Sequence, residues 1–507
     1  MKNKYDEVPY LGYVHRQTHI ENIALVAALF QVPYPSFNGA TVLEIGCGDG
    51  TNLINMAYQL PDTSFYGFDA SKVQIDHGCE LIERSGLSNV KLAQLFVVDF
   101  DKSIGQFDYI ICHGVFSWVE DEVRSQILRL IKSHLKPNGI AYLSYNVLPG
   151  WNMYGMIRDM MLFHTRGIDD HDERVMQAHA MLQFIGKHNL SSNDPYGQFM
   201  SNTMKDIAKM DHSYVFHEYL EEHNKAFYFH EFWNLINSHG LQYLGDTEFN
   251  GMSNHNFPEE SKAILDSIAG NIHDMEQYMD FLRCRRFRCS LLMHDGFDIA
   301  RDVTLVPFQY FYFSFHPDAN ERSNMPTSTQ LNAMLMQLAF ADGASAAEHP
   351  IYKEALVFLS EAWPSRKHFD EIVGAIQSNL SRLISAEELA DLCALLQALF
   401  LKGMLDAHLY RPTICNEISA FPKVSSLQRL VATKSNMICS QTHKSLHLYR
   451  PASLAVITKM DGTHSIDALQ AAMEQAITDV EPDSQESASE RLQHLLNDLL
   501  CNGALVG

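Results

Sequence analysis

The strongest constraint on the fold is an apolar stretch that leads straight into a glycine-rich turn. It reads Thr41-Val42-Leu43-Glu44-Ile45-Gly46-Cys47-Gly48-Asp49-Gly50-Thr51. Glycines at alternate positions let the backbone pass close to a ligand, and the N–H groups that open a helix over residues 52–58 suit a carboxylate or a phosphate. The sequence therefore predicts a strand, a tight turn and a helix that together hold a nucleotide-type cofactor.

The residues around this turn favour one kind of cofactor over another. A dinucleotide fingerprint needs a glycine or an alanine three residues after its second glycine, where this chain has Thr51. Instead, Asp69 closes the next strand, where its carboxylate can accept hydrogen bonds from both ribose hydroxyls of an adenosyl group. A plainer role, capping the helix that begins near Ser71, is compatible with the first. A turn that binds no ligand would not need this acid.

The pattern Glu44-x-Gly46-x-Gly48-x-Gly50, followed by Asp69, resembles the first two motifs of class I S-adenosylmethionine-dependent methyltransferases. The resemblance implies S-adenosyl-L-methionine as the cofactor and a doubly wound, seven-stranded α/β sheet. It also implies a cofactor site at the residues of the two motifs, which are Glu44, Gly46, Cys47, Gly48, Gly50 and Asp69.

The first part of the chain alternates apolar strands with helical patterns, as in a doubly wound α/β domain. The predicted strands cover residues 41–45, 64–69, 90–98, 107–112 and 140–145. Each ends in polar or small residues, which suits a parallel sheet whose ligand site lies beyond the carboxyl ends of its strands. Thr18 with Glu21, and Ser117 with Glu120, form capping boxes that predict helix starts. The first of these helices should lie over the cofactor cleft.

Two other strand ends carry candidate cofactor contacts. Asp99 and Phe100 would meet the adenine, with the acid accepting from its amino group and the ring stacking on its face. The alternative is a loop acid beside a core phenylalanine. At His113 we favour a polar side chain packed near the methionine moiety over a general base. The tetrapeptide His113-Gly114-Val115-Phe116 also differs from the Asn/Asp-Pro-Pro-aromatic sequence of methyltransferases that modify exocyclic base amines, which argues against that substrate.

A helical insertion is predicted next. Residues 149–229 have a helical pattern and no strand comparable to the first five. Strands at residues 240–244 and 287–293 would then complete the seven-stranded sheet. The catalytic domain is therefore expected to cover residues 1–296, and a chain ended there should fold and bind cofactor.

Several motifs resemble bacterial protein-lysine methyltransferases that carry a methyltransferase regulatory domain. They are YNVLPGW at 145–151, MIRDMM at 156–161, HEYLE at 217–221, GLQYL at 240–244, FLR at 281–283 and FR at 287–288. In that family the regulatory segment corresponds to about residues 212–296 of this chain. The resemblance implies methyl transfer to protein lysine side chains and leaves the individual substrate open.

Two mostly helical, winged-helix-like domains are predicted to follow, over residues 297–410 and 411–507. Pro326, Gly343 and Pro350 mark a linker region in the first of them. A capping box then starts a helix further along, made by Ser385 and Glu388.

The charge of the chain bears on what these domains bind. Winged helices often bind DNA, but the formal net charge is −23, and residues 460–490 include acids and no Lys or Arg. Phosphate binding draws on clustered cations, so no DNA partner is expected. We interpret the C-terminal domains as interaction modules through which a homodimer can form.

For the methyl acceptor we predict a protein lysine that enters a pocket of aromatic side chains. The pocket residues are Tyr13, Trp118, Tyr145 and Trp151. Aromatic rings desolvate the amine and still attract the methylated cation. The plainer interpretation is that all four are core aromatics. Two other functions stay open: a methyltransferase for a small molecule or RNA, and a non-catalytic scaffold that binds S-adenosylmethionine.

Other polar residues are expected to be structural. His217, His223 and His230 lack metal-ligand spacing on one helix face, so no metal is predicted. The arginines at 283, 285, 286 and 288 are expected to be solvated or ion-paired at the surface.

The location of the protein is inferred from its cysteines and its apolar runs. Nine cysteines, an odd number with no Cys-x-x-Cys pair, indicate free thiols in a reducing compartment, which predicts a cytoplasmic protein. No apolar run approaches the ~20 residues of a membrane span, so no membrane insertion is expected.

Overall fold

A computed structural model describes residues 4–7, 10, 12–100, 104–188, 194–315, 349–482 and 485–507. The predicted linker positions Pro326 and Gly343 lie outside the described residues.

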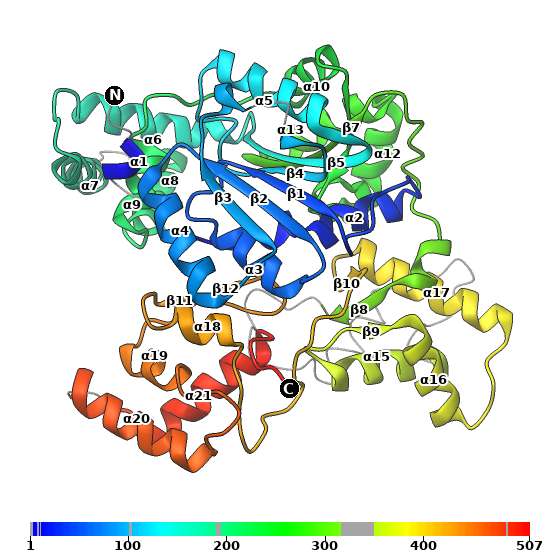
Figure 1. The fold of residues 1–507 in the computed structure, drawn as a ribbon. Coiled ribbons are helices and arrows are strands. Elements are labelled where there is room, and N and C mark those ends of the chain that lie inside the picture. The colour runs from blue at the N-terminus through cyan, green and yellow to red at the C-terminus, as the bar shows by residue number, and fades with distance from the viewer. Residues whose placement is uncertain are drawn as a thin grey trace.

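A seven-stranded sheet forms the centre of the first domain, with the strand order β3-β2-β1-β4-β5-β7-β6 (Figure 1). The strands are β1 Thr41–Ile45, β2 Ser64–Asp69, β3 Val90–Gln94, β4 Phe107–Cys112, β5 Leu135–Asn146, β6 Leu241–Asp246 and β7 Phe287–His294. Neighbours among β1 to β5 pair in parallel, whereas β7 runs antiparallel to both β5 and β6. The predicted class I methyltransferase fold is confirmed.

Two strands differ from the prediction by more than two residues at one end. The third ends at Gln94, and a short 3-10 helix, Val97–Asp99, replaces its predicted last residues. The fifth begins at Leu135 rather than Ile140, because the chain leaves helix α5 directly into extended backbone.

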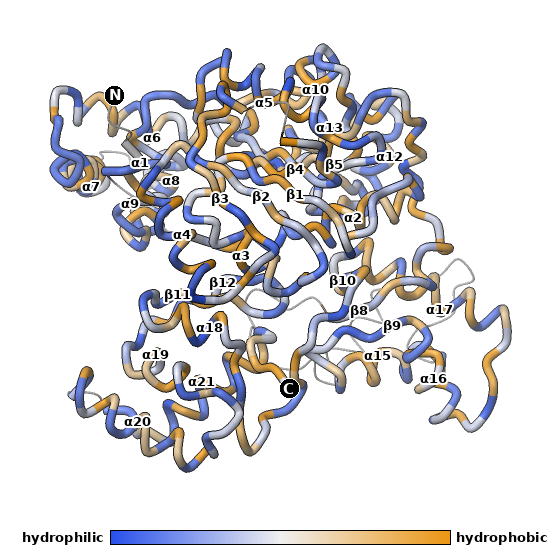
Figure 2. Tube along the Cα trace, in the orientation of Figure 1, coloured by the Kyte–Doolittle hydropathy of each residue, from blue (hydrophilic) through white to orange (hydrophobic). Residues whose placement is uncertain are grey.

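Helices cover both faces of this sheet, and each face has its own apolar core. Helices α2 Ile20–Leu29, α3 Thr51–Gln59 and α4 Lys72–Ser85 lie on one face. Helices α5 Asp121–His134 and α10 Phe229–Ser238 lie on the other. Apolar residues follow the central strands in Figure 2, as expected for parallel strands buried on both sides.

Two of the predicted helix caps are corrected. Helix α2 is capped by His19, whose ring accepts from the Glu21 N–H, rather than by Thr18. Helix α5 starts at Asp121, and the Ser117 hydroxyl accepts from the Asn146 N–H instead of capping the helix. In both cases the predicted cap bonds to a distant element, Thr18 to Asn52 of α3 and Ser117 to the end of β5, which a local pattern does not reveal.

Residues 151–219 form the predicted helical insertion, which packs around its own core at the left of Figure 1. Its helices are α6 Trp151–His164, α7 His171–His188, α8 Pro195–Ile207 and α9 His212–Tyr219. The short helix α1, Lys4–Glu7, lies beside them, and Glu7 pairs with His171 of α7 at 2.8 Å. Between β6 and β7 the chain forms helices α11 Phe249–Met252, α12 Glu259–Ile268 and α13 Ile272–Arg283.

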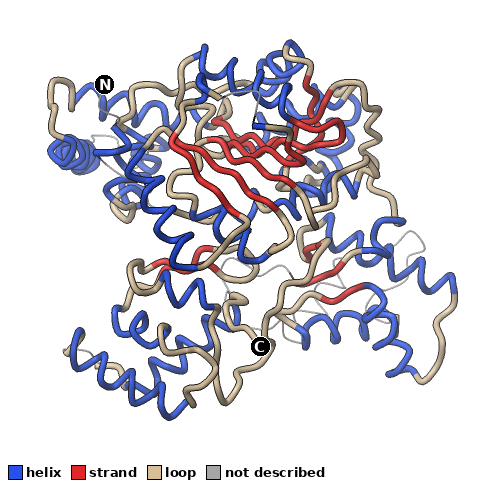
Figure 3. Tube along the Cα trace, in the orientation of Figure 1, coloured by secondary structure: helices blue, strands red, loops and turns tan. Residues whose placement is uncertain are grey.

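The middle part of the chain packs as a separate apolar cluster below the sheet in Figure 3. It contains helices α15 Pro350–Ala362, α16 Phe369–Leu380 and α17 Ala386–Leu401, and a sheet of β8 Tyr312–Phe315, β9 Lys367–His368 and β10 Leu405–His408. The capping box of Ser385 and Glu388 is confirmed. Leu25 and Leu29 of α2 belong to this cluster, so α2 is shared between the two domains.

The C-terminal part has a further core of its own. Its helices are α18 Ser426–Val431, α19 Pro451–Ile457, α20 Ile466–Val480 and α21 Ala488–Cys501, and a hairpin joins β11 Met437–Cys439 to β12 Ser445–His447. Near the end of this part, Val424 and Leu505 form an isolated antiparallel bridge.

All nine cysteines carry free thiols. Among the described helices, none combines the length and the apolar character needed to cross a membrane.

Candidate active site

The glycine turn after β1 is held against the end of β2. Gly46, Gly48 and Gly50 have φ angles of 69°, 56° and 73°, in the left-handed region where glycine is favoured. The Gly46 N–H donates to the Phe68 carbonyl at 2.9 Å, and the Gly48 N–H donates to Asp69 at 3.0 Å. Nothing lies within 4 Å of the position of a Cβ at Gly48, so the turn leaves room for a ligand there.

Asp69 supports the turn and the next helix at the same time. One carboxylate oxygen accepts from Gly48, and the other accepts from the Ser71 N–H at 2.8 Å. Ser71 caps α4 with its own hydroxyl. Asp69 stays half-buried, and burial raises the pKa of its carboxyl. The supporting role and a contact to a ligand are therefore compatible.

Glu44 carries a buried oxygen without a partner. Its side chain is 4% exposed, and Oε1 accepts from Asn52 Nδ2 at 2.9 Å. Oε2 has no hydrogen-bond partner in the described part of the chain, and burial raises the pKa of the carboxyl to about 8. A buried carboxylate oxygen left unpaired is unfavourable unless a donor reaches it.

These groups fit S-adenosylmethionine. The ammonium of the cofactor suits the open oxygen of Glu44, its ribose hydroxyls suit Asp69, and its carboxylate suits the N–H groups that open α3. Cys47 contributes backbone to the turn, because its thiol is buried and burial holds the pKa of that thiol well above its usual range.

The N-terminal segment lies across the cofactor turn. A Cβ at Gly12 would lie 2.3 Å from Thr51 Oγ1, so only glycine fits against the turn there. Asp6 accepts from the Ser71 hydroxyl at 2.7 Å, and the carbonyl of Tyr10 accepts from the side chain of Gln74. Asp6, Tyr10 and Gly12 therefore lie at the carboxyl ends of β1 and β2.

His113, at the end of β4, packs among neutral partners. Its Nδ1 lies 2.8 Å from the Tyr142 hydroxyl, and its ring centroid lies 3.9 Å from that of His15. Burial and the neighbouring His15 hold the pKa of His113 well below its usual range. The imidazole is neutral at pH 7 and a weak base, which favours the positioning role over general-base catalysis.

Asp99 and Phe100 lie as the alternative interpretation describes them, as a loop acid beside a core phenylalanine. Asp99 is exposed at the end of the 3-10 helix after β3. The Phe100 ring packs at 5.0 Å from the rings of both Phe68 and His134, as part of the core on the α5 face. Their contact with the adenine stays a prediction.

Two of the predicted pocket aromatics meet. The rings of Trp118 and Trp151 lie edge to face at 6.1 Å, and Tyr154 of α6 stacks on Trp151 at 5.9 Å. Trp151 Nε1 donates to Asn224 at 2.8 Å, and the guanidinium of Arg158 lies 5.2 Å from the Trp118 ring. These contacts fix both tryptophans at the junction of the sheet and the helical insertion.

Tyr145 lies elsewhere. Its side chain is 1% exposed, its ring stacks on Phe232 at 3.9 Å, and its hydroxyl contacts Ser290. It belongs to the core between the sheet and α10. This position corrects the expectation that Tyr145 lines a substrate pocket, since a substrate cannot reach the ring. Successive residues of β5 point to opposite faces, so Tyr142 and Asn146 lie on the face of His113 instead.

Tyr13 faces the insertion rather than the two tryptophans. Its hydroxyl donates to Asp211 at 3.1 Å, and Asp211 directly precedes α9. Burial and this carboxylate raise the pKa of Tyr13 to about 12.

Sequence reasoning missed several residues of the site. Asn52 holds Glu44, His15 stacks on His113, and the buried Nδ2 of Asn146 has no partner among the described residues. Asn146 falls inside one of the motifs that carried the resemblance to lysine methyltransferases, and that resemblance was the one signal that pointed to it.

The four arginines of residues 283–288 do not share one environment. Arg288 is fully buried and bonds to Asp246, Glu276 and Asp280 at 2.7–2.8 Å. Arg285 joins the same cluster. The expectation of a surface cluster is therefore wrong for these two, because β7 carries Arg288 into the interior.

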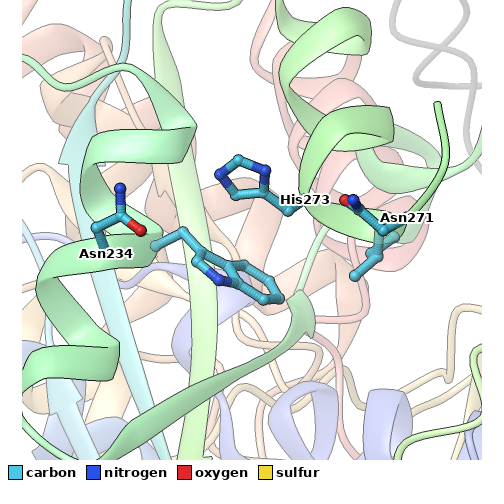
Figure 4. A pocket seen from close by; sticks show the side chains of 5 residues that line it. Asn234, Asn271 and His273 are labelled. Atoms are coloured by element: carbon cyan, nitrogen blue, oxygen red, sulfur yellow. The ribbon is translucent and has the colours of Figure 1, made fainter. Parts of the chain in front are cut away.

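A cavity of about 320 Å³ is lined by Trp233, Asn234, Asn271, Ile272 and His273 (Figure 4). None of the predicted site residues lines it. No group of three or more His, Cys, Asp or Glu side chains in the described ranges is placed to hold a metal ion.

Two family models match the chain. The model described as "Methyltransferase domain" matches residues 43–141, and the model described as "Predicted methyltransferase regulatory domain" matches residues 211–294.

Two relatives come from Rickettsia prowazekii (strain Madrid E). Uncharacterized protein RP789 is 40% identical over 318 residues, which are 62% of this chain and 57% of RP789. Uncharacterized protein RP028 is 42% identical over 231 residues, which are 46% of this chain and 92% of RP028. The alignment thus spans a little over half of RP789 and nearly all of RP028.

A solved structure matches almost the whole chain. PKMT2 from Rickettsia typhi, in complex with AdoHcy, superposes with a TM-score of 0.83 at 30% identity. The match covers 98% of this chain and 100% of that chain. A second structure of the same protein gives a TM-score of 0.80 at 31% identity.

Proposed function

The chain belongs to the class I S-adenosylmethionine-dependent methyltransferases that carry a methyltransferase regulatory domain, and on that basis we propose that it methylates lysine side chains of proteins. The cofactor is S-adenosyl-L-methionine. The observation that carries the proposal is the match to PKMT2 over 98% of the chain, which agrees with the motifs that resemble protein-lysine methyltransferases.

The chemistry of methyl transfer to lysine defines what this site requires. When bound, the cofactor supplies a methyl group on a positively charged sulfur. The acceptor must be a neutral amine in line with that methyl group. With a reference pKa near 10.4, removing the proton of lysine at pH 7 costs about 4.6 kcal/mol. A site for lysine should therefore both disfavour the ammonium and accept its proton.

We place the acceptor at the aromatic surface where the N-terminal segment meets the insertion. The proposed acceptor site retains Trp118, Trp151 and Tyr13 of the predicted pocket and omits Tyr145. The cofactor contacts proposed are those of the glycine turn with Asp69, and His113 beside the methionine moiety. Trp118 and Tyr13 are half-buried, so their rings are accessible to a side chain that enters from solvent.

Methyl transfer from labelled S-adenosylmethionine tests the proposal. The purified protein is incubated with total protein, RNA and metabolite fractions, and the labelled product is analysed by mass spectrometry. Methylated lysine is expected in the protein fraction. Label in RNA or in a small molecule, or cofactor binding without any product, contradicts the proposal.

The Trp118→Ala variant tests the proposed acceptor site. We expect it to lower turnover on the protein substrate while cofactor affinity and melting temperature stay close to the wild-type values. Substitution of an exposed aromatic residue remote from the site, Tyr310→Ala, serves as the control. A Trp118 variant with wild-type turnover would remove this residue from the acceptor site.

A further inference from the structure

A cluster of tyrosines lies between the N-terminal segment and the helices of the insertion. Its members are Tyr10, Tyr13, Tyr154, Tyr214 and Tyr219. The rings of Tyr10 and Tyr214 are 6.2 Å apart, and Tyr13 and Tyr154 are close enough to raise the pKa of Tyr214. Aromatic rings in such an arrangement attract a cation by their negative faces.

Glu218 provides the acidic group of this cluster. It follows Tyr214 by four residues in the same helix, α9, so the two side chains share one face. The Glu218 side chain is half-buried. Among the described residues, its carboxylate has neither a hydrogen-bond donor nor a cation within ion-pair distance.

Two arginines face Glu218 but bind other groups. Arg158 donates to the backbone carbonyls of Glu218 and Glu221 at 2.9 and 2.6 Å. Arg286 bonds to the Tyr154 hydroxyl and lies over its ring at 4.8 Å. Within the described ranges, the Glu218 carboxylate is therefore left open to a bound partner.

The cluster adjoins the cofactor turn through Tyr13. The residue before it, Gly12, packs on Thr51 of the turn, and His15, two residues after it, stacks on His113. Tyr13 thus sits where the segment crosses from the glycine turn to the end of β4. A side chain held by the tyrosine cluster would enter next to the position of the cofactor methyl group.

We propose that Glu218, with Tyr13, Tyr154 and Tyr214 around it, binds the ammonium of the acceptor lysine and takes its proton. This inference rests on the proposed function and names the residue that performs the deprotonation. The ammonium N–H bond breaks and its proton passes to the Glu218 carboxylate. The freed nitrogen pair then forms the N–C bond as the C–S bond breaks, and the electrons of that bond stay on the sulfur, which becomes neutral.

The charge balance around Glu218 suits this role. Burial raises the pKa of Glu218 to about 7, and the positive charges of Arg158 and Arg286 partly oppose that rise. Tyr214 and Tyr219, on its own helix, are close enough for Glu218 to raise their pKa values, and Tyr154 of α6 acts on the same two tyrosines. The carboxylate form, which accepts the proton, grows as pH rises through about 7, so turnover should rise over the same range.

The test compares Glu218→Gln with a matched control, Glu222→Gln, which removes the same charge from an exposed position nearby. We expect Glu218→Gln to lower kcat/KM on a protein lysine by roughly 100-fold, as for loss of a general base. The rise in rate through pH 7 should also disappear. The control should keep the wild-type kcat/KM and the rise in rate through pH 7. All variants should keep the wild-type cofactor affinity and melting temperature.

A second variant, Glu218→Asp, keeps the test valid if Glu218→Gln fails to fold. Glu218→Asp keeps the charge and should retain the pH-dependent rise with a reduced rate. The inference is overturned if Glu218→Gln methylates lysine at the wild-type rate with the wild-type pH profile, or if Glu218→Asp loses the profile. If the wild-type protein methylates no lysine, the proposed function fails and this inference fails with it.

Discussion

At the residue scale, Asp69 tests the cofactor site. Asp69→Ala removes a proposed charged acceptor for the ribose and also the support of the Gly48 and Ser71 N–H groups. We expect the affinity for S-adenosylmethionine to fall by about 1.5–3 kcal/mol, the range for hydrogen bonds to charged groups. Calorimetry measures it, with the exposed Asp62→Ala as control. Unchanged affinity in the Asp69 variant would remove this residue from the site.

Glu44 predicts a pH dependence of cofactor binding. Burial raises the pKa of Glu44 to about 8, so the free protein holds this carboxyl largely protonated below that pH. The cofactor ammonium prefers the carboxylate, so the affinity should rise with pH toward 8, by at most about tenfold per pH unit. Titrations at several pH values with Glu44→Gln alongside test this. The variant should bind more weakly and with a flatter pH profile, and equal slopes in both proteins would contradict the assignment.

At the scale of elements, Arg288 joins three of them. From β7 it bonds to Asp246 on β6 and to Glu276 and Asp280 on α13, all fully buried or nearly so. Arg288→Met leaves three buried carboxylates with too few cations, and breaking a buried pair in this way costs about 3–5 kcal/mol.

Chemical denaturation measures that loss of stability. The control is Arg129→Met, which removes an exposed arginine paired with Glu122. An exposed pair contributes about 0–1 kcal/mol, so the control should unfold almost as the wild type does. Similar unfolding free energies for both variants would show that the buried cluster does not hold β6, β7 and α13 together.

Helix α2 is the second element with a testable role, because Glu21 ties it to the middle domain. The carboxylate accepts from Arg366 at 2.9 and 3.0 Å and from the Leu409 N–H at 3.1 Å, all in the interior. Arg366 holds the pKa of Glu21 well below its usual range. Glu21→Leu should therefore destabilise the protein by about 3–5 kcal/mol.

The double variant of Glu21→Leu with Arg366→Met distinguishes the interaction between these two residues from their contacts with other residues. Removing both charges avoids an unpaired buried ion, so the double variant should be more stable than the Glu21 single variant. Thermal melting of the variants compares them. Additive losses would mean that the two residues do not act as a pair.

At the scale of the whole molecule, the C-terminal domain reaches the cofactor site. His443, in the β11–β12 hairpin, lies 2.9 Å from Asn52 Oδ1, and Asn52 in turn donates to Glu44. Gln428 of α18 donates to Asn55 of α3 at 2.6 Å. The hairpin and α18 therefore brace the helix that follows the glycine turn.

We expect His443→Ala to weaken cofactor binding by about 1 kcal/mol, the net contribution of one hydrogen bond. Asn52 keeps its hydrogen bond to the Thr18 hydroxyl, so the loss should not be larger. Calorimetry measures the affinity, and hydrogen exchange of α3 reports whether the helix loosens. The exposed His494→Ala is the control. Unchanged cofactor affinity and unchanged hydrogen exchange would show that the contact of His443 with Asn52 does not support cofactor binding.

The same contacts bear on the expected independence of residues 1–296. A chain ended at 296 keeps every strand of the sheet, but it exposes Leu25 and Leu29 and leaves Glu21 without Arg366. Sequence patterns place the strands correctly and do not show that α2 belongs to two cores. The boundary at residue 296 therefore stays a prediction.

The sequence by itself determined the local elements of the cofactor site. The observed bounds of β2 and β4 equal the predicted ones, and the glycine turn, its helix and α17 lie where the patterns indicated. Strand alternation, helical periodicity and turn glycines act within a few residues, so a short stretch contains the information needed to recognise them. Motif resemblance extended this to the cofactor and to the family.

Only the tertiary structure decided which side chains meet. Tyr145 is a core residue because the pairing of β5 with β7 turns its ring toward α10, and Arg288 is buried because β7 lies between two other strands. Tyr13 meets Asp211, and His443 meets Asn52, across separations that no sequence period spans. Such contacts depend on long-range packing of whole elements, whose geometry is set by the three-dimensional fold and is not encoded in any one stretch of the chain.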